Sequence, residues 1–187
     1  MYLIVGLGNP GEKFEGTRHN IGRDILQAAQ KKFGLPNFVL NRKWQAVVSE
    51  GKIENGKAVL LLPETFVNKS GNAVTPAARF YKMRPKNFIL VHDDVDLLLG
   101  ATKLSWGRNS GGHKGVESVM RALKTKHFWR MRIGVQKKRR LRGQNLVLQK
   151  FRGDETTLTQ KVIRKSLGAI AIIAANGPEY AMNVYNQ

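Results

Sequence analysis

The chain begins with Met1-Tyr2-Leu3-Ile4-Val5-Gly6-Leu7-Gly8, an apolar run that passes directly into a glycine-rich segment. A short, continuous apolar run that ends in glycines is typical of a buried strand leading into a loop. Residues 20–33 then carry apolar side chains at helical spacing, and Gly34 and Pro36 end the predicted helix. A strand, a loop and a helix in this order form the first unit of an α/β fold.

The same alternation continues through the rest of the chain. Further strands are predicted at residues 46–49, 59–62, 88–91, 101–106, 131–135 and 146–148, and further helices at residues 71–82, 115–123 and 155–175. Strands that alternate with helices predict a single α/β domain over residues 1–187, with a mixed, mostly parallel sheet flanked by helices. In such folds the functional side chains gather in loops at the carboxyl ends of the strands.

The composition excludes several kinds of site. The chain has 187 residues and no cysteine, which rules out disulfides, a thiol nucleophile and Cys-ligated metal sites. The longest apolar runs, such as residues 169–175, fall short of the roughly 18–20 residues that a membrane span needs. No basic segment with an apolar core precedes the first strand. We therefore expect a soluble protein of the cytoplasm with no membrane partner.

The charge is strongly positive and unevenly distributed. Thirty-two Lys and Arg against 13 Asp and Glu give a net charge of +19. Residues 118–153 hold twelve basic residues and no acidic one, including the run Lys137-Lys138-Arg139-Arg140 followed by Arg142. A stretch of one sign on this scale indicates nucleic-acid binding. For the run alone, a solvated and self-repelling loop is the alternative. An anionic membrane fits less well, because no segment pairs the basic residues with an apolar helix face.

Residues 6–11, Gly-Leu-Gly-Asn-Pro-Gly, match the glycine fingerprint of dinucleotide-binding folds. Two features count against a nicotinamide cofactor. Pro10 removes a backbone donor that would bind the pyrophosphate, and no acidic residue ends a second strand about 20 residues later. These glycines are better explained by a tight turn that lets a ligand or another loop approach closely.

Polar side chains stand at the start of two predicted helices. His19 lies next to Arg18, where a helix N-terminus disfavours positive charge and favours the neutral imidazole that can accept a proton. The alternative is a histidine that caps the helix. Asn68, in the loop of residues 63–71, is either an ordinary helix cap or a donor and acceptor for a ligand carbonyl.

Three carboxylates follow the strand at residues 88–91, namely Asp93, Asp94 and Asp96. Clustered carboxylates suit Mg²⁺, so a magnesium site is one interpretation. Successive side chains on an extended chain point to opposite faces, however, so Asp93 and Asp94 are expected to diverge. A single carboxylate that orients a histidine is the favoured interpretation.

Taken together, these loops resemble a known family. Residues 6–11 with Thr17-Arg18-His19-Asn20, then residues 65–71, then residues 92–97 with Gly111-Gly112-His113, are closely similar to bacterial peptidyl-tRNA hydrolase, and the resemblance runs to the closing residues 181–186. It implies a monomeric α/β globule around a twisted mixed sheet. It also implies cleavage of the ester between a peptide and the 3′-terminal adenosine of tRNA, with peptidyl-tRNA as partner through its acceptor stem and 3′ end. No metal and no cofactor are implied.

The resemblance assigns roles to individual residues. His19 corresponds to the general base that deprotonates water, Asp93 to the carboxylate that holds the imidazole, and Asn9 to the position that distinguishes a blocked from a free amino group. The remaining residues expected to contact the substrate or the tRNA are Phe14, Phe66, Asn68, Lys103, Lys114 and Arg132.

Three positions depart from the family pattern. Phe14 stands where a tyrosine is usual, Lys114 stands where an asparagine is usual, and residues 136–142 are more basic than usual. A lysine near His19 should lower the pKa of the histidine. Its long side chain can also turn its ammonium towards solvent or towards tRNA phosphates. We therefore expect an active enzyme in which Lys114 contacts the substrate.

The main alternative is a catalytically impaired RNA-binding protein on the same fold. The high charge and Lys114 favour this alternative. The presence of Asn9, His19, Asn68 and Asp93 together favours the enzyme, because RNA binding alone does not require that set. A peptide or amide hydrolase that does not use RNA leaves the charge of +19 unexplained.

Overall fold

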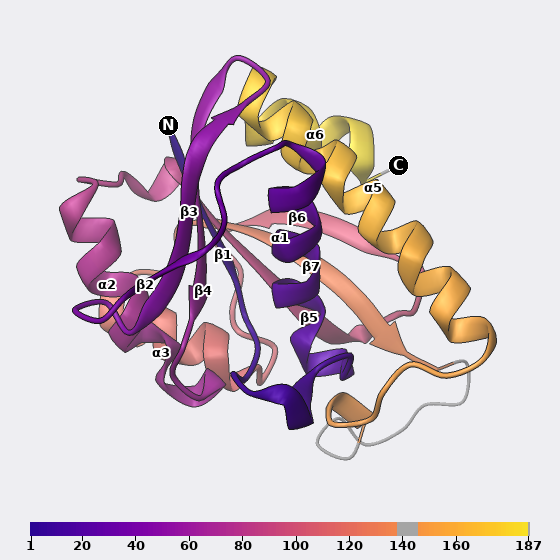
Figure 1. Ribbon diagram of the computed structural model, residues 1–187. Helices are drawn as coiled ribbons and strands as arrows, with labels where there is room; N and C mark the ends of the chain where they lie inside the picture. Colours follow the sequence, from indigo (N-terminus) through magenta and orange to yellow (C-terminus); the bar gives the residue numbers. More distant parts are fainter. Residues whose placement is uncertain (138–145, 187) are drawn as a thin grey trace.

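Seven strands form one sheet in the order β2-β3-β4-β1-β5-β7-β6 in the computed structural model, which describes residues 1–137 and 146–186 (Figure 1). The strands are Tyr2–Gly6 (β1), Val39–Asn41 (β2), Ala46–Ile53 (β3), Gly56–Pro63 (β4), Phe88–Leu98 (β5), Thr102–Trp106 (β6) and Trp129–Gln136 (β7). The central strands β4, β1, β5 and β7 pair in parallel, while β3 and β6 run in the opposite direction. Since β2 is antiparallel to β3, five strands share one direction. The predicted mixed, mostly parallel sheet of an α/β domain is confirmed.

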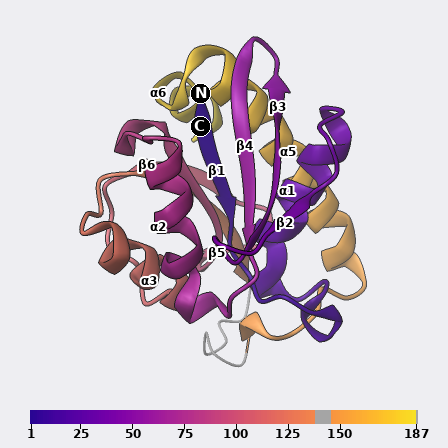
Figure 2. The same ribbon diagram turned by 60° about the vertical axis from the view of Figure 1, so that its left-hand side comes forward.

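Helices cover both faces of the sheet (Figures 1 and 2). Helices α1, α5 and α6 lie on one face, and α2 and α3 lie on the other. The α-helices are Ile21–Lys32 (α1), Ser70–Phe80 (α2), Lys114–Leu123 (α3), Asp154–Asn176 (α5) and Pro178–Tyr185 (α6), and the short 3₁₀ helices are Glu12–Phe14 (η1), Arg18–Asn20 (η2), Val67–Lys69 (η3) and Pro85–Asn87 (η4).

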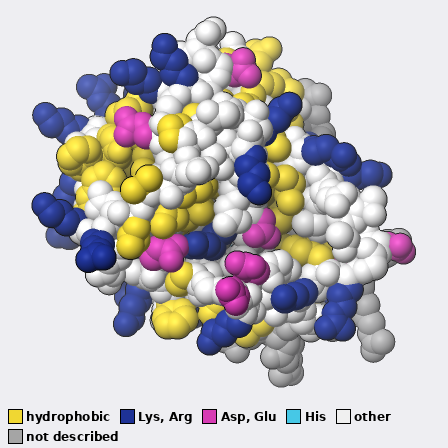
Figure 3. Space-filling view, viewed as in Figure 1, with side chains coloured by type: hydrophobic (Ala, Val, Ile, Leu, Met, Phe, Trp, Pro, Cys, Tyr) yellow, Lys and Arg dark blue, Asp and Glu magenta, His cyan; other side chains and the backbone are white. Residues whose placement is uncertain are grey.

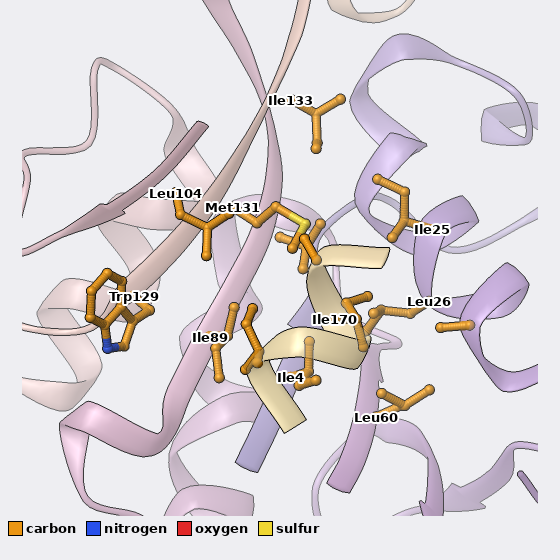
Figure 4. Packing of buried hydrophobic residues seen from close by; sticks show 14 of the residues in the cluster. Ile4, Ile25, Leu26, Leu60, Ile89, Leu104, Trp129, Met131, Ile133 and Ile170 are labelled. Carbon is orange, nitrogen blue, oxygen red and sulfur yellow. The ribbon is translucent and has the colours of Figure 1, made fainter. Parts of the chain in front are cut away.

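The alternation of side chains along β1 divides the core into two layers. Ile4 packs towards α1 and α5, whereas Leu3 and Val5 pack towards α2 and α3. Figure 4 shows the first layer, in which Ile4 lies near Ile170 of α5. All four of these side chains are fully buried. A central strand with both faces covered must be apolar at every position, which explains the continuous run at the N-terminus.

Glycines allow the segment after β1 to pack closely against the segment before α1. A Cβ atom at Gly8 would lie 2.7 Å from Oδ1 of Asn20 and 2.8 Å from Cδ of Arg23. No side chain fits at such a distance, so glycine is required for this approach. The predicted close approach of another loop is confirmed, with Asn20 as the neighbour. Three residues of η1 and three of η2 stand between the loop and α1, unlike the immediate helix of a dinucleotide-binding turn.

The prediction for residues 92–97 was wrong in one respect. They form no loop, because β5 continues to Leu98 and stays paired with β7 through His92, Asp93 and Asp94. The pairing is interrupted by an irregularity after Asp94 and resumes at Leu98, which pairs with Gln136. The strand predicted at residues 146–148 was also wrong, since Leu146 and Val147 are helical. The basic residues 138–142 lie outside the described residues.

Two elements were not predicted, β2 and α6. The short α6 brings Asn186 against the edge strand β6, where its side-chain amide accepts from the backbone nitrogen of Leu104 at 2.7 Å and donates to the backbone oxygen of Leu104 at 2.8 Å. This amide therefore takes the place of a neighbouring strand at that point of the edge.

Within the described part of the chain, no helix is long and apolar enough to cross a membrane.

Candidate functional site

A cavity of about 400 Å³ opens at the carboxyl end of β5. The segments that enclose it come from distant parts of the sequence: η2, η3, the end of β5 and the start of α3. Its lining residues are His19, Val67, Asn68, Asp93, Val95, Gly111, Gly112, His113, Lys114 and Val147. Parallel strands place their carboxyl ends together, so the position agrees with the general rule for α/β folds.

Asp93 lies between two histidines at the base of the cavity. Its Oδ1 atom is 2.7 Å from Nδ1 of His19 and 2.8 Å from Nε2 of His113. The carboxylate is only 2% exposed, and the two rings have centroids 4.9 Å apart. One buried oxygen therefore orients both imidazoles.

Backbone contacts of His113 define which nitrogen of its ring carries the proton. His113 is the N-cap of α3, and its Nδ1 accepts hydrogen bonds from the amides of Gly115 and Val116 at 3.1 and 3.3 Å. Nδ1 is therefore unprotonated, and Nε2 donates to Asp93. His19 donates to the same oxygen through Nδ1, which leaves its Nε2 free to accept a proton.

The charge of Asp93 controls the ionisation of His19. Burial alone would lower the pKa of His19, but the charge of Asp93 and the hydrogen bond to it raise that pKa above its ordinary value. Burial alone would raise the pKa of Asp93, but His113 and His19 hold it well below its usual range. The helix start was predicted to favour the neutral form of His19, but the charge of Asp93 outweighs this effect and raises the pKa of His19. The capping alternative for His19 is wrong, because its side chain bonds to Asp93 and caps no helix.

A third histidine, His92, is neutral and packs behind the pair. Burial, followed by the neighbouring His113, lowers the pKa of His92 to about 3. Its Nδ1 lies 2.7 Å from the backbone oxygen of Asp93, and its ring meets the ring of His113 edge-on at 4.9 Å. An uncharged ring at this place adds no positive charge next to His113.

Asn9 is held rigidly beside the cavity. Its Oδ1 accepts from the amide of Val67 at 2.9 Å, while its backbone nitrogen and oxygen both bond to the side chain of Asn20 at 2.9 Å. Because Oδ1 is already used, the Nδ2 amino group is the end of the side chain that can donate to a ligand. Asn9 is not itself a lining residue of the cavity, but it bonds to Val67, which is one.

Of the residues predicted to contact the peptide and the terminal nucleotide, Asn68 lines the cavity, whereas Phe14 and Phe66 do not. Phe66 is 56% exposed and meets Phe14 edge-on at 6.3 Å. Asn68 is exposed on η3 and lines the cavity. The alternative of Asn68 as a helix cap is wrong, since Lys69 occupies the N-cap of α2 and no side chain bonds there. Phe66 directly precedes the lining residue Val67, so the aromatic pair lies near the cavity.

The three carboxylates of β5 do not converge, which confirms the expected divergence of Asp93 and Asp94. Asp94 accepts from Nε of Arg132 at 2.6 Å, on the other side of the strand. Arg132 is the cross-strand neighbour of Lys103, so these two predicted tRNA contacts lie together on β7 and β6 and outside the cavity. The magnesium site considered for Asp93, Asp94 and Asp96 is therefore not formed.

One other group has the spacing of metal ligands. Ligand atoms of His19, Asp93 and His113 lie within 4.8 Å of one another. Their contacts have hydrogen-bond lengths of 2.7–2.8 Å, and the Nε2 atom of His113 must carry a proton because its Nδ1 is an acceptor. A metal would need both facing nitrogens deprotonated. The arrangement fits a hydrogen-bonded carboxylate better than a metal centre.

Lys114 lines the cavity but turns its ammonium outwards. The side chain is 68% exposed, and Nζ is 3.4 Å from a carboxylate oxygen of Glu117. The predicted lowering of the His19 pKa by Lys114 was wrong, since Asp93 controls that pKa and raises it. The expected swing of the long side chain towards solvent is confirmed.

Buried arginines that the sequence did not reveal position the site. Arg18 is fully buried and forms two bonds of 2.7–2.8 Å to the carboxylate of Glu155 at the start of α5. Arg23 bonds to Glu64 at 2.6 Å. Nothing in the spacing of these residues identifies their partners. His113, by contrast, follows two glycines and precedes a predicted helix, a pattern that could have indicated an N-cap.

The mixed sheet, with a histidine held by a buried carboxylate beside a cavity, defines an α/β protein whose site is suited to hydrolysis. The model of the family "Peptidyl-tRNA hydrolase" matches residues 3–187. The chain belongs to the peptidyl-tRNA hydrolase family.

Relatives support this assignment over the full length. The chain is 40% identical over 186 residues to the peptidyl-tRNA hydrolase of Thermoanaerobacter sp. (strain X514) and 37% identical over 189 residues to that of Thermodesulfovibrio yellowstonii, with all of both chains covered in each case. Among solved structures, a complex of peptidyl-tRNA hydrolase with N-propanol has a TM-score of 0.92 at 33% identity, covering 100% of this chain and 94% of that one. The enzyme from Acinetobacter baumannii has a TM-score of 0.91 at 31% identity, with the same coverage.

Proposed function

We propose that the protein cleaves the ester bond between a peptide and the 3′-terminal adenosine of tRNA, which returns free tRNA to translation in the cytoplasm. The observation that carries this proposal is the His19–Asp93 pair, bonded at 2.7 Å beside a cavity of about 400 Å³. Ester hydrolysis near neutral pH needs a base held in position, and Nε2 of His19 is available for that role.

The reaction begins with a water molecule in the cavity beside His19. Nε2 of His19 removes a proton as the water attacks the ester carbon, and Asp93 stabilises the imidazolium that results. The amide groups of Asn9 and Asn68 supply donors to the polar atoms of the substrate. As the tetrahedral intermediate collapses, the ester bond breaks and the His19 imidazolium gives its proton to the 3′ oxygen, which leaves as the hydroxyl of the tRNA while the peptide leaves with a free carboxyl group. No metal is required in this scheme, because an imidazole activates the water.

The tRNA is bound by the basic surface outside the cavity. Lys103 and Arg132 lie side by side on β6 and β7, and Lys114 stands at the cavity edge. Their charges suit the phosphates of the acceptor stem and 3′ end. Phe66 and Phe14 present rings near the cavity, against which a terminal base can stack. One chain supplies every residue of this arrangement, so a monomer suffices.

The purified protein tests the proposal directly. Release of an N-blocked amino acid from tRNA is expected, with free aminoacyl-tRNA largely spared. The alternative of an RNA-binding protein that has lost hydrolysis predicts tRNA binding with no release. The intact hydrogen bonds of Asp93 to both histidines favour the enzyme.

Substitutions at Lys114 test its role as a substrate contact. Lys114→Asn should keep activity, because the amide restores a donor and an acceptor at the same place. Lys114→Ala should raise KM several-fold with little change in kcat, since its exposed ammonium interacts with phosphate equally in the ground and transition states. Steady-state kinetics over a range of salt concentrations measure both effects. An unchanged KM in Lys114→Ala would remove this residue from the binding surface.

Neutralising the pair on β6 and β7 should weaken tRNA binding through charge alone. The double substitution Lys103→Gln and Arg132→Gln is expected to flatten the slope of log affinity against log salt by about 0.7–0.9, the value for one phosphate, because Lys103 is exposed whereas Arg132 is mostly buried and already pairs with Asp94. The matched control is Lys161→Gln with Lys165→Gln, two exposed cations of α5. Filter binding of deacylated tRNA measures the slopes, and equal slopes in the two double variants would contradict the proposed surface.

A further inference from the structure

A second groove, of about 890 Å³, lies at the β2 edge of the sheet. It shares no lining residue with the catalytic cavity, so the two hollows are separate. It is formed by β2, the turn that follows it, β3 and the end of α2. The side chains that matter for the argument are Leu40, Arg42, Lys43, Trp44, Phe80 and Tyr81.

Three aromatic rings form one wall of this groove. The ring centroids of Trp44 lie 5.1 Å from Phe80 and 5.6 Å from Tyr81, and those of Phe80 and Tyr81 are 5.0 Å apart. The hydroxyl of Tyr81 donates to Glu50 at 2.8 Å, which fixes the cluster against β3. Phe80 is nevertheless 67% exposed. A large ring held by its neighbours and open to solvent is a preformed surface for another flat group.

Cations surround the aromatic wall. Arg42 and Lys43 line the groove, and Arg79 and Lys82 flank Phe80 and Tyr81 in the chain. All four are exposed, and none forms an ion pair with an acidic residue in the described part of the chain. Glu50 is the acidic residue that lines the groove, and its carboxylate already accepts from Tyr81. In Figure 3 the apolar side chains on the left of the view are bordered mostly by Lys and Arg, with some Asp or Glu side chains beside them.

We propose that this groove binds an unpaired stretch of RNA. Bases stack on Phe80 and Trp44, while the phosphates between them pair with Arg42 and Lys43. Each nucleotide supplies one flat base and one negative charge, and the groove offers rings and cations side by side in the same way. A protein partner that covered Leu40 would have to provide an acidic group for each cation, because burying an unpaired charge is costly. The chain carries a net charge of +19, which attracts RNA to the whole surface.

The proposal is tested with the full chain and a short fluorescein-labelled oligouridylate that carries no ester. Phe80→Ala should weaken binding by about fivefold or more, the effect of losing one stacked base. Arg42→Gln with Lys43→Gln should flatten the salt slope by about 1.4, the value for two single-strand phosphates. The matched control for the ring is Tyr180→Ala, a 54% exposed aromatic on α6. The kcat for peptidyl-tRNA should stay unchanged in Phe80→Ala, which shows that the variant is folded.

The oligonucleotide can also bind to the basic surface that contains Lys103 and Arg132. Binding is therefore repeated in the background of Lys103→Gln and Arg132→Gln, where the loss caused by Phe80→Ala should persist, since distant sites act additively. A higher KM for peptidyl-tRNA in Phe80→Ala would identify the RNA as an unpaired part of the substrate, and an unchanged KM would identify a separate RNA. Equal oligonucleotide affinity in Phe80→Ala and the unaltered protein would overturn the proposal. Loss of self-association in Phe80→Ala with unchanged oligonucleotide binding would also overturn it, in favour of a second copy of the chain.

Discussion

Replacing His19 with alanine is expected to lower kcat for peptidyl-tRNA by about 10²–10⁴-fold, the range for a general base. The reason is geometric: Nε2 of His19 is the free nitrogen of a ring that Asp93 holds at 2.7 Å beside the cavity. The affinity for deacylated tRNA should change little, because the imidazole acts mainly in the transition state. Single-turnover release of an N-blocked amino acid measures the rate, and filter binding measures the affinity.

The matched control is His127→Ala, which removes an exposed histidine outside the cavity and should leave kcat unchanged. If His19→Ala retains substantial activity, His19 is not the base and the proposed mechanism is wrong. If tRNA affinity falls in parallel with kcat, the histidine contributes to binding rather than to proton transfer.

The second large effect is expected at Asp93. Asp93→Asn should lower kcat by about 10²-fold, less than the loss of the imidazole itself, because His19 remains present but is poorly oriented. An asparagine offers one oxygen and one amino group where two ring nitrogens now donate to a single carboxylate oxygen. The negative charge that stabilises the His19 imidazolium is therefore lost, and a neutral amide oxygen replaces the carboxylate oxygen that both rings now share.

The same substitution should shift the pH dependence in a definite direction. The neutral form of His19 is the base, so kcat/KM falls as the pH drops through the pKa of His19. The charge of Asp93 raises that pKa, and its removal should move the acid limb of the profile to lower pH. Asp94→Asn is the control, because Asp94 faces Arg132 on the other side of β5. An acid limb that stays in place in Asp93→Asn would show that the carboxylate does not control the base.

Much of the fold could be predicted because burial dictates the composition of its central strands. β1 and β4 are apolar at consecutive positions since both faces of the sheet are covered. The end of β5 could not be predicted, because its carboxylates bond to residues that are distant in the sequence. Asp94 bonds to Arg132 on β7, and Asp93 bonds to His19 and His113. β2 has only three residues, and α6 is short, so neither gives a strong periodic pattern.

The site was predictable where a local rule applied. Side-chain alternation on an extended strand separates Asp93 from Asp94, and that rule holds on β5. The position of His113 depends on the packing of α3 against α2 and η3, which no local pattern contains. The pairing of Arg18 with Glu155 likewise joins residues 137 positions apart. Sequence reasoning therefore located the carboxylate and one histidine, whereas only the folded chain shows what holds them.

The contact between Asn186 and Leu104 has a consequence for folding and for resistance to aggregation. Before the last residues dock, β6 has no hydrogen-bonded neighbour on its outer side at Leu104, and an open edge of this kind can pair with a strand of another molecule. Docking of Asn186 occupies both backbone groups of Leu104. During synthesis this protection arrives only after Asn186 has been made, 82 residues after Leu104. The interval before it forms is thus a period in which newly made copies are exposed to aggregation.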